Sequence, residues 1–399
     1  MLIYNTDKNC IEMYMGYIGG VHQWTCNGKI NDVGDVSNPP SSATATLGAI
    51  QDYRFIVFQH KGKDYRVKDL GYTNQGVAPN EEISISIPYT NAQPTNGAYT
   101  AFEQTLPLKN AAGYTQDFKL YYPAGNFTGA TGTIQAILKN VSGAVYMPEI
   151  YAKDGVYRNL ISGANAYSIS LNGGVSTTSL KVQEITAIPD RCFDTTTSDC
   201  VGYGANEKEH QFVYIPIKGR DGKLWLNNNL GADYSNVNSS AFNPLQQATS
   251  LSDKNAYGSH FQWGRDADGH ELFTYTTSTS GNKVNPNIPL YSYQLQTFTN
   301  PCPDGYHVST KDEWDAYTKK LSSGDASRWF ADPLKLTYAG IPYSDGTWDT
   351  APGANRAYYW SSSPDGEYGA KALSIYASGS GTGSYTARIL AFSLRCRQD

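Results

Sequence analysis

Short segments in which apolar and polar residues alternate run through the first half of this chain. The clearest is residues 83–87, Ile-Ser-Ile-Ser-Ile, which repeats with the period expected of a strand with one buried face. Other strand-like segments lie at 53–58, 118–122, 133–138 and 167–171. Because clusters of Gly, Asn and Pro separate these segments, the sequence predicts a β-sandwich over residues 43–186.

The length of the chain requires more than this one domain. Its 399 residues exceed what one hydrophobic core usually organises, so about two or three cores are expected. Every tryptophan except Trp24 lies after residue 211, which predicts a compact aromatic core in a C-terminal domain over 205–399. With 40% hydrophobic residues, 17% charged residues and many turn formers, we expect a mainly β protein with a small α+β C-terminal domain.

Residues 1–37 predict a separate N-terminal β-hairpin or connector element. The segments 1–4 and 11–15 are strand-like, and residues 5–9 supply the turn between them. A hairpin of this size buries little by itself, so we expect it to cap or connect a larger assembly.

One helix is expected, at residues 311–321. Thr310 and Glu313 have the spacing of a capping box, and the apolar residues from Trp314 to Leu321 recur on one face. This helix is expected to lie against a sheet.

The cysteines suggest disulfide bonds. The six residues fall into three groups, which are Cys10 with Cys26, Cys192 with Cys200, and Cys302 with Cys396. Such neighbours favour sequential pairing, although other pairings are open and buried free thiols in a cytosolic protein are the alternative. No cysteine lies in a Cys-x-x-Cys motif or at zinc spacing from a histidine, which favours disulfides over metal ligation.

The charge and hydropathy of the chain argue against two classes of partner. The net charge is -5 and the Lys and Arg residues are scattered, so no basic stripe is present to bind nucleic acid. No apolar segment reaches the ~18–20 residues that span a bilayer, and the N-terminal residues lack the features of a signal peptide. We expect no nucleic-acid partner and no membrane span, and any export signal is expected to lie upstream or to have been removed.

Five blocks in the C-terminal half resemble a known family. They are residues 223–231, 261–271, 300–310, 359–363 and 392–396. In this order they resemble the Fibrobacter succinogenes major paralogous domain, and the resemblance implies a C-type-lectin-like module. Two features depart from the family pattern, because Asp266 stands where a basic residue is usual and the link over 187–208 is unusually long.

A weaker resemblance covers the rest of the chain. Residues 85–91 and 97–99 are similar to sandwich repeats that accompany this module in surface proteins of Bacteroidetes-type bacteria. Residues 1–6 are similar to an element at the base of such proteins and in phage tail fibres. The resemblance implies a secreted, cell-surface or virion-associated protein.

The resemblance also implies a non-catalytic adhesin that binds a host or bacterial surface glycan or protein through loops in residues 340–388. This segment is rich in Tyr, Trp, Ser, Asn and Gly, the residues of antibody-like paratopes. The candidate ligand-binding residues are Tyr343, Trp348, Asn355, Arg356, Tyr358, Tyr376, Ser378 and Tyr385. In a strand with Leu373 and Ile375 inward, Ser374 and Tyr376 are expected to face solvent. The same composition also suits a plain solvated β surface.

Two alternatives remain open. The first is a structural subunit of a fimbria or phage tail fibre, in which residues 1–37 form a homo-oligomer or fibre. The second is an enzyme, because a fold related to this family houses the enzymes that generate formylglycine with a reactive cysteine pair. We expect no catalysis, because Cys302 and Cys396 are expected to pair with each other and no Gly-x-Ser-x-Gly, His-Glu-x-x-His or Walker motif is present.

No cofactor is expected, although calcium has a weak candidate site. The sugar-binding triplets of calcium-dependent C-type lectins are missing. Asp266, Asp268 and Glu271 offer oxygen ligands from a tight turn. We favour a polar turn without a metal, because an EF-hand loop needs more carboxylates at longer spacing.

Overall fold

The computed structural model describes strands at 2–5, 10–18 and 21–29 and residues 43–68, 71–195, 210–322, 324–343 and 347–399. Side chains are described from residue 43 onward, except those of residues 384 and 385. Strands account for 43% and helices for 6%, so the expected mainly β fold is confirmed. Within these ranges, no helix has the length and apolar character needed to pass through a bilayer.

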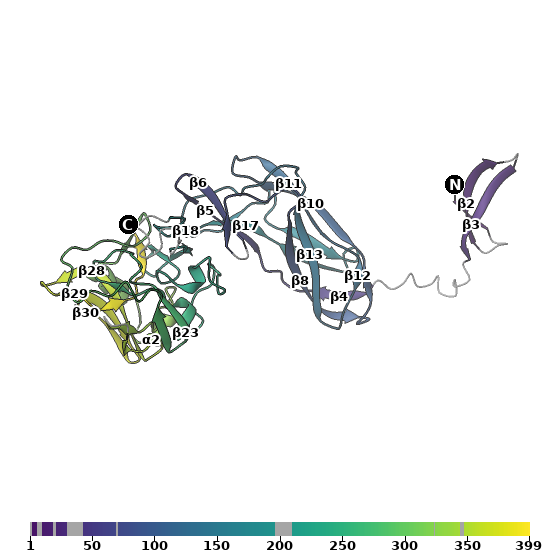
Figure 1. The fold of residues 1–399 in the computed structure, drawn as a ribbon. Coiled ribbons are helices and arrows are strands. Elements are labelled where there is room, and N and C mark those ends of the chain that lie inside the picture. The colour runs from purple at the N-terminus through teal and green to yellow at the C-terminus, as the bar shows by residue number, and fades with distance from the viewer. Residues whose placement is uncertain are drawn as a thin grey trace.

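At the N-terminus three antiparallel strands form a sheet of their own. The order is β1-β2-β3, with bounds Leu2–Asn5, Cys10–Ile18 and Val21–Lys29. The third strand extends the expected hairpin. The register pairs Cys10 with Lys29 and Glu12 with Cys26, so the two cysteines lie in neighbouring strands, while their side chains fall outside the described part. In Figure 1 this sheet lies apart from the other described strands.

Two five-stranded sheets follow and enclose a common core. The first has the order β10-β11-β13-β8-β4, with bounds Phe102–Lys109, Thr115–Tyr122, Gly132–Asn140, Glu82–Gln93 and Thr44–Leu47. The second has the order β14-β17-β5-β6-β7, with bounds Arg158–Asn159, Val182–Thr186, Tyr53–His60, Lys63–Val67 and Tyr72–Thr73. Two further strand pairs are β9 with β12 (Ala98–Tyr99, Gly125–Asn126) and β15 with β16 (Tyr167–Leu171, Ser176–Leu180). The pair β17 and β5 is parallel.

The alternation in β8 explains how the first sheet faces this core. Ile85 and Ile87 are buried, whereas Ser84 and Ser86 are exposed. The two isoleucines join Phe55 of the second sheet in one hydrophobic cluster. The period-two pattern of the sequence therefore sets the inner and outer faces of this strand.

The second sheet is buried on both faces. Phe55 and Val57 of β5 belong to the sandwich core, whereas Ile56 and Phe58 lie in another cluster with Phe242. The remaining buried members of that cluster are Tyr65, Ile185, Ala187, Phe193, Val213, Ile215 and Val237. Because these residues come from both halves of the chain, the sandwich and the C-terminal region share a continuous apolar interface.

The described part of the expected link, residues 187–195, belongs to this interface. β18 (Ile188–Pro189) pairs with β19 (Val213–Tyr214). Cys192 is buried and disulfide-bonded, and its expected partner, Cys200, lies outside the described residues. The first part of the link is thus fixed in position beside the C-terminal region.

The C-terminal region contains a four-stranded and a three-stranded sheet. The first has the order β20-β21-β32-β25, with bounds Pro216–Lys218, Leu224–Leu226, Cys396–Gln398 and Tyr306–Val308. The second has the order β28-β29-β30, with bounds Arg356–Asp365, Gly369–Tyr376 and Gly379–Ala387. Three short pairs are β22 with β31 (Phe261–Gln262, Ala391–Phe392), β23 with β24 (Phe273–Thr277, Ser280–Lys283) and β26 with β27 (Ile341–Pro342, Trp348–Thr350). The pairing of β21 with β32 joins the beginning and end of this region.

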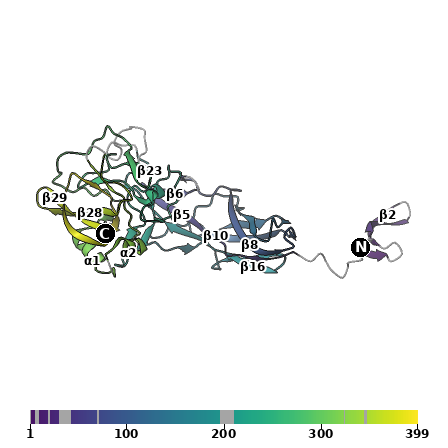
Figure 2. The same cartoon turned by 90° about the horizontal axis from the view of Figure 1, so that it is seen from below.

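Two α-helices lie beside these sheets. α1 (Lys311–Thr318) begins at the expected capping box, in which Thr310 Oγ1 accepts from the Glu313 N–H at 3.2 Å and Glu313 Oε2 accepts from the Thr310 N–H at 2.9 Å. It ends before the expected residue 321 and packs on the β28-β29-β30 sheet, as Figure 2 shows. α2 (Ala326–Ala331) was not expected from the sequence. Short 3-10 helices occur at Asp233–Ser235 and Lys254–Ala256.

A disulfide and a group of tryptophans hold the C-terminal region together. Cys302 and Cys396 form the expected bond, with their Cα atoms 5.9 Å apart. The almost completely buried tryptophans are Trp225, Trp263, Trp314, Trp329 and Trp360. These tryptophans divide between two hydrophobic clusters, with Trp263 and Trp360 in one and Trp225, Trp314 and Trp329 in the other. The tryptophans are buried as expected, but in more than the one core that the sequence predicted.

Candidate functional site

Several candidate ligand-binding residues surround one hollow on the C-terminal region. The hollow has a volume of about 380 Å³ and is lined by Asp349, Thr350, Ala351, Ala354, Asn355, Arg356 and Tyr376. Arg356 and Tyr376 share it because the register of β28 and β29 pairs them directly. The structure thus brings together Asn355, Arg356 and Tyr376, which the sequence had singled out.

A hydrogen-bonded group of side chains forms one wall of the hollow. Arg356 Nη2 lies 2.9 Å from Asp349 Oδ2, and Arg356 Nε donates to Thr350 Oγ1 at 2.5 Å. The hydroxyl of Tyr343, which lies outside the lining, donates to Asp349 Oδ1 at 2.6 Å. Thr350 Oγ1 also donates to Asp349 Oδ2, at 3.1 Å, so Asp349 accepts from three side chains and holds them in place. Arg356 Nη1 has no hydrogen bond to any described residue.

Tyr376 lines the hollow, and Tyr358 on the adjacent strand contacts it from outside the lining. The hydroxyl oxygens of Tyr358 and Tyr376 are 2.6 Å apart. Tyr376 is 37% exposed, and Tyr343 beyond Asp349 is 44% exposed. Burial and the hydrogen bond with Tyr376 raise the pKa of Tyr358 to about 12, so Tyr358 remains protonated at neutral pH.

This arrangement suits recognition by hydrogen bonding and stacking. The guanidinium of Arg356, the amide of Asn355 and the carboxylate of Asp349 offer donors and acceptors, and the ring of Tyr376 offers an apolar face. The volume falls in the range of small-ligand pockets, about 300–1,000 Å³. No histidine or cysteine is among the lining residues, so the hollow offers no thiol or imidazole for acid, base or nucleophilic chemistry.

Ser378 and Tyr385 lie on the neighbouring hairpin. Ser378 is exposed in the turn that joins β29 to β30, two residues after Tyr376. Tyr385 lies in β30 opposite Lys371, and its side chain is outside the described residues. Neither residue lines the hollow.

Trp348 belongs to a different cluster, although it precedes Asp349 in β27. Its indole N–H donates to the Gly281 carbonyl at 3.1 Å. Its ring lies 5.5 Å from that of Phe273 and 5.4 Å from that of His260, measured between ring centres. Trp348 is thus half-buried against a small core and does not line the hollow.

The expectation that Ser374 faces solvent is wrong. Its side chain is 1% exposed, and Oγ donates to the Gly381 carbonyl at 3.0 Å. The pairing of β29 with β30 is irregular between Ala372 and Ser374. Leu373 shares a hydrophobic cluster with Trp314 of α1, whereas Ala372, on the face of Ser374, belongs to the cluster that contains Phe392. A strand covered on both faces does not follow the simple alternation of buried and exposed residues.

The weak calcium candidates do not gather at one point. Asp266 forms an ion pair with Arg191. Asp268 and Glu271 instead lie with His270 in a group whose potential ligand atoms are within 4.8 Å of one another. The structure therefore separates Asp266 from the other two carboxylates.

The side chains of this group already have protein partners. His270 Nε2 accepts from the Gln262 N–H at 3.1 Å, so Nδ1 carries the proton and donates to Asp268 Oδ1 at 2.6 Å. Burial lowers the pKa of His270. Glu271 Oε1 lies 2.6 Å from His210 Nε2; burial opposes its ionisation, but the hydrogen bond and charge of His210 hold the pKa of Glu271 below its usual value. We interpret the group as an internal network that ties this turn to His210.

Asp349 and Thr350 are the site residues that sequence reasoning missed. A signal was present, because Asp349 lies between the aromatic residues of the segment and close to Arg356 in the sequence, but its ion pair depends on the turn that follows β27. Comparisons with protein-family models, curated proteins and solved structures gave no match to this chain. The assignment of the site therefore rests on its residues and geometry.

Proposed function

We propose that this protein is a non-catalytic, secreted or cell-surface binding protein that recognises a glycan through the hollow around Arg356 and Tyr376. The observation that carries this proposal is the convergence of Asn355, Arg356 and Tyr376 on one hollow, with Asp349 fixing the guanidinium. Sugar hydroxyls match these polar groups, and the apolar face of a sugar ring matches an exposed tyrosine.

Two further observations support this proposal. The Cys302–Cys396 bond and the disulfide-bonded state of Cys192 favour an oxidising compartment. The pairing of β21 with β32, the helix α1 and the disulfide are compatible with the C-type-lectin-like module that the sequence resemblance implies. Such a scaffold presents its loops in a fixed arrangement and so lowers the entropy lost on binding.

A glycan array probed with the full chain tests the proposal. We expect the wild type to bind a small set of related glycans. Arg356→Ala removes the guanidinium from the hollow and should weaken binding about tenfold or more. Tyr114→Ala is the matched control, because it removes a tyrosine that is 73% exposed on the sandwich, and it should bind like the wild type.

Two outcomes would reject the proposal. The first is a wild-type chain that binds no glycan on the array but captures a protein from a panel of host and bacterial surface proteins. The second is an Arg356→Ala variant that binds the same glycans with unchanged affinity.

A second candidate is a structural subunit of a fimbria or phage tail fibre that assembles through residues 1–37. The observation that favours it is the separate sheet β1-β2-β3, whose outer strands each have one neighbour among the described strands. Such edges can pair with another chain. Sedimentation of the chain with and without residues 1–42 tests this role: oligomers only with the segment support it, and monomers in both contradict it.

The enzymatic alternative has a direct chemical test. Cys302 and Cys396 are buried and bonded to each other, whereas a formylglycine-generating enzyme needs a reactive cysteine pair. Thiol titration of the unfolded, unreduced chain should find no thiol at either position, and a free thiol at either would revive this alternative.

A further inference from the structure

Two opposite charges line the hollow at Arg356 and balance each other. Asp349 and Arg356 are the charged members of the lining, and Arg356 Nη2 lies 2.9 Å from Asp349 Oδ2. The side chain of Arg356 is 39% exposed and that of Asp349 is 35% exposed, so a ligand can reach both. The hollow therefore presents a hydrogen-bond donor beside an acceptor without a net charge.

Both charged groups can form further hydrogen bonds after they have paired. Arg356 Nη1 has no hydrogen bond to any described residue, so its N–H groups are available as donors. Asp349 Oδ1 accepts from the Tyr343 hydroxyl, and a carboxylate oxygen can accept a second hydrogen bond. One ion pair thus offers a donor and an acceptor to a ligand.

This arrangement matches two adjacent hydroxyl groups of a sugar ring. One hydroxyl can donate to Asp349 Oδ1 while its neighbour accepts from Arg356 Nη1. Asn355 also lines the hollow and is exposed, and its amide can both donate and accept. The exposed ring of Tyr376 offers a surface on which the apolar face of the same sugar ring can pack.

A charge on the ligand would gain little in this hollow. A carboxylate placed against Arg356 also lies close to the carboxylate of Asp349, so attraction and repulsion at similar distances largely cancel. The ligand carboxylate would still lose part of its hydration, and no net attraction offsets this cost. The same reasoning, with the signs exchanged, applies to an ammonium group.

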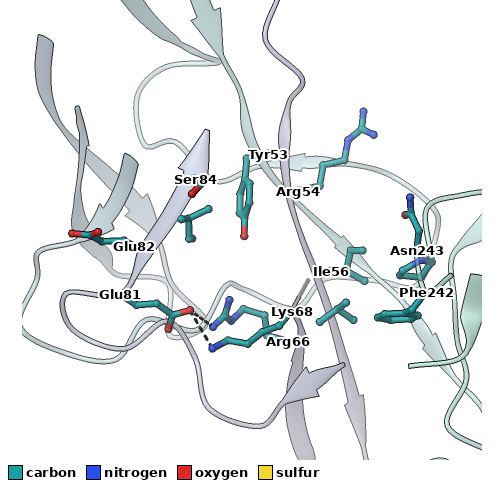
Figure 3. A pocket seen from close by; sticks show the side chains of 13 residues that line it. Tyr53, Arg54, Ile56, Arg66, Lys68, Glu81, Glu82, Ser84, Phe242 and Asn243 are labelled. Atoms are coloured by element: carbon teal, nitrogen blue, oxygen red, sulfur yellow. Dashed lines mark hydrogen bonds and ion pairs between the residues drawn. The ribbon is translucent and has the colours of Figure 1, made fainter. Parts of the chain in front are cut away.

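A larger cleft, of about 810 Å³, lacks this balance of charge. It lies between the sandwich and residues 242–244 of the C-terminal region and is shown in Figure 3. There Arg66 Nη2 and Lys68 Nζ both lie near one oxygen, Glu81 Oε1, at 2.9 and 3.4 Å. Because one carboxylate lies near two cations in that cleft, the balanced pair is a feature of the hollow at Arg356.

We propose that the hollow selects a neutral sugar and excludes uronic acids, sialic acids and other charged sugars. This inference rests on the proposed glycan-binding function and specifies which glycans the hollow takes. Adjacent hydroxyls of one sugar ring bind Asp349 and Arg356, and the apolar face of that ring packs on Tyr376. The ion pair that fixes the guanidinium therefore also sets the selectivity.

An array that carries D-glucose, D-galactose and D-mannose, each beside its uronate and its uronamide, tests this selectivity with the full chain. A uronamide has nearly the shape of the uronate but no charge, so the ratio of their binding reports the effect of the charge. In the series that binds, the wild type should bind the hexose and the uronamide, and should bind the uronate about tenfold more weakly. Added salt should leave binding of the hexose unchanged.

Asp349→Asn keeps the shape of the side chain and removes its charge, so the charge of Arg356 is no longer balanced. The ratio of uronate to uronamide binding should rise about tenfold in this variant. Asp117→Asn is the matched control, because Asp117 is exposed in β11 outside the lining, and its ratio should equal that of the wild type. A melting curve shows whether each variant is folded, and the wild-type ratio alone decides if Asp349→Asn is not.

Three results would count against the inference. Equal binding of a uronate and its uronamide to the wild type would overturn it, and so would an unchanged ratio in folded Asp349→Asn. Tighter binding of the uronate that is lost in Arg356→Ala would show that the hollow takes acidic sugars, so the proposed function would stand and this inference would fall. Absence of binding to every sugar and glycan would instead reject the proposed function, and this inference with it.

Discussion

The buried guanidinium of Arg395 joins segments that are far apart in the sequence. Its Nε and Nη2 donate to Asn229 Oδ1 at 3.1 and 2.8 Å. Its Nη1 donates to the carbonyls of Leu226, Asn227 and Leu334 at 3.2, 3.2 and 2.7 Å. Burial lowers the pKa of Arg395 to about 10, so the side chain is still charged at neutral pH.

Arg395→Met should destabilise the protein strongly. The methionine fills part of the space but donates no hydrogen bond, so Asn229 Oδ1 and several carbonyls lose a buried partner. We expect the free energy of unfolding to fall by about 3 kcal/mol or more, measured by urea denaturation of the full chain. A loss below about 1 kcal/mol would show that these acceptors find other donors.

Glu184 in β17 should make stability depend on pH. Its side chain is buried, and this burial raises the pKa from 4.5 to about 7. Because the folded pKa exceeds the unfolded one, the native state holds a proton that the unfolded state releases, and stability falls as pH rises from 4.5 through about 7.

Glu184→Gln removes this dependence. The free energy of unfolding of the variant minus that of the wild type should rise by about 2–3 kcal/mol from pH 5 to pH 8. Urea denaturation of both proteins at the two pH values measures this gain. An unchanged difference between variant and wild type would show that Glu184 ionises in the folded state as easily as in the unfolded state.

Among the helices and strands, the sequence predicts those that are determined by interactions between neighbouring residues. The capping box at Thr310 and the alternation in β8 act through neighbouring residues, so both were predicted. α2 has only six residues and no visible period, although Asp325 accepts from the Arg328 N–H at its start. Ser374 was placed wrongly because burial of β29 on both faces is a tertiary effect.

The candidate site also has a part that the sequence predicts and a part that depends on tertiary structure. Composition was enough to single out Asn355, Arg356 and Tyr376, because paratope-like residues concentrate in that segment. The ion pair with Asp349 and the separation of Trp348 depend on how β27 lies against its neighbours.

Trp348→Ala and Tyr376→Ala should have different effects on stability. Trp348→Ala removes ring contacts with Phe273 and His260 and should cost about 2 kcal/mol or more. Tyr376→Ala changes an exposed ring and should cost less than about 1 kcal/mol. Urea denaturation of the two variants measures both values, and equal losses would contradict the distinction between core and ligand surface.

At the scale of the whole molecule, the sandwich and the C-terminal region should unfold together. Ile56 and Phe58 of β5 share a buried cluster with Val213 and Ile215, and the link to β18 is part of it. Separation of the two regions would expose these side chains to water. The apolar interface therefore supports the domain that carries the hollow.

The isolated segment 205–399 should be less stable than the same region in the full chain. Loss of the shared cluster should lower its free energy of unfolding by about 3 kcal/mol or more and expose an apolar patch that binds a hydrophobic dye. Denaturation of the segment and of the full chain, followed by tryptophan fluorescence, measures the difference. Equal stability would mean that the interface contributes little.

Hydrogen–deuterium exchange of the full chain, with and without the best glycan from the array, locates the ligand on the molecule. Recognition at the hollow predicts slower exchange in residues 349–356 and 374–378 and unchanged exchange in β10 and β11. Unchanged exchange in residues 349–356 and 374–378, together with slower exchange elsewhere, would contradict recognition at the hollow.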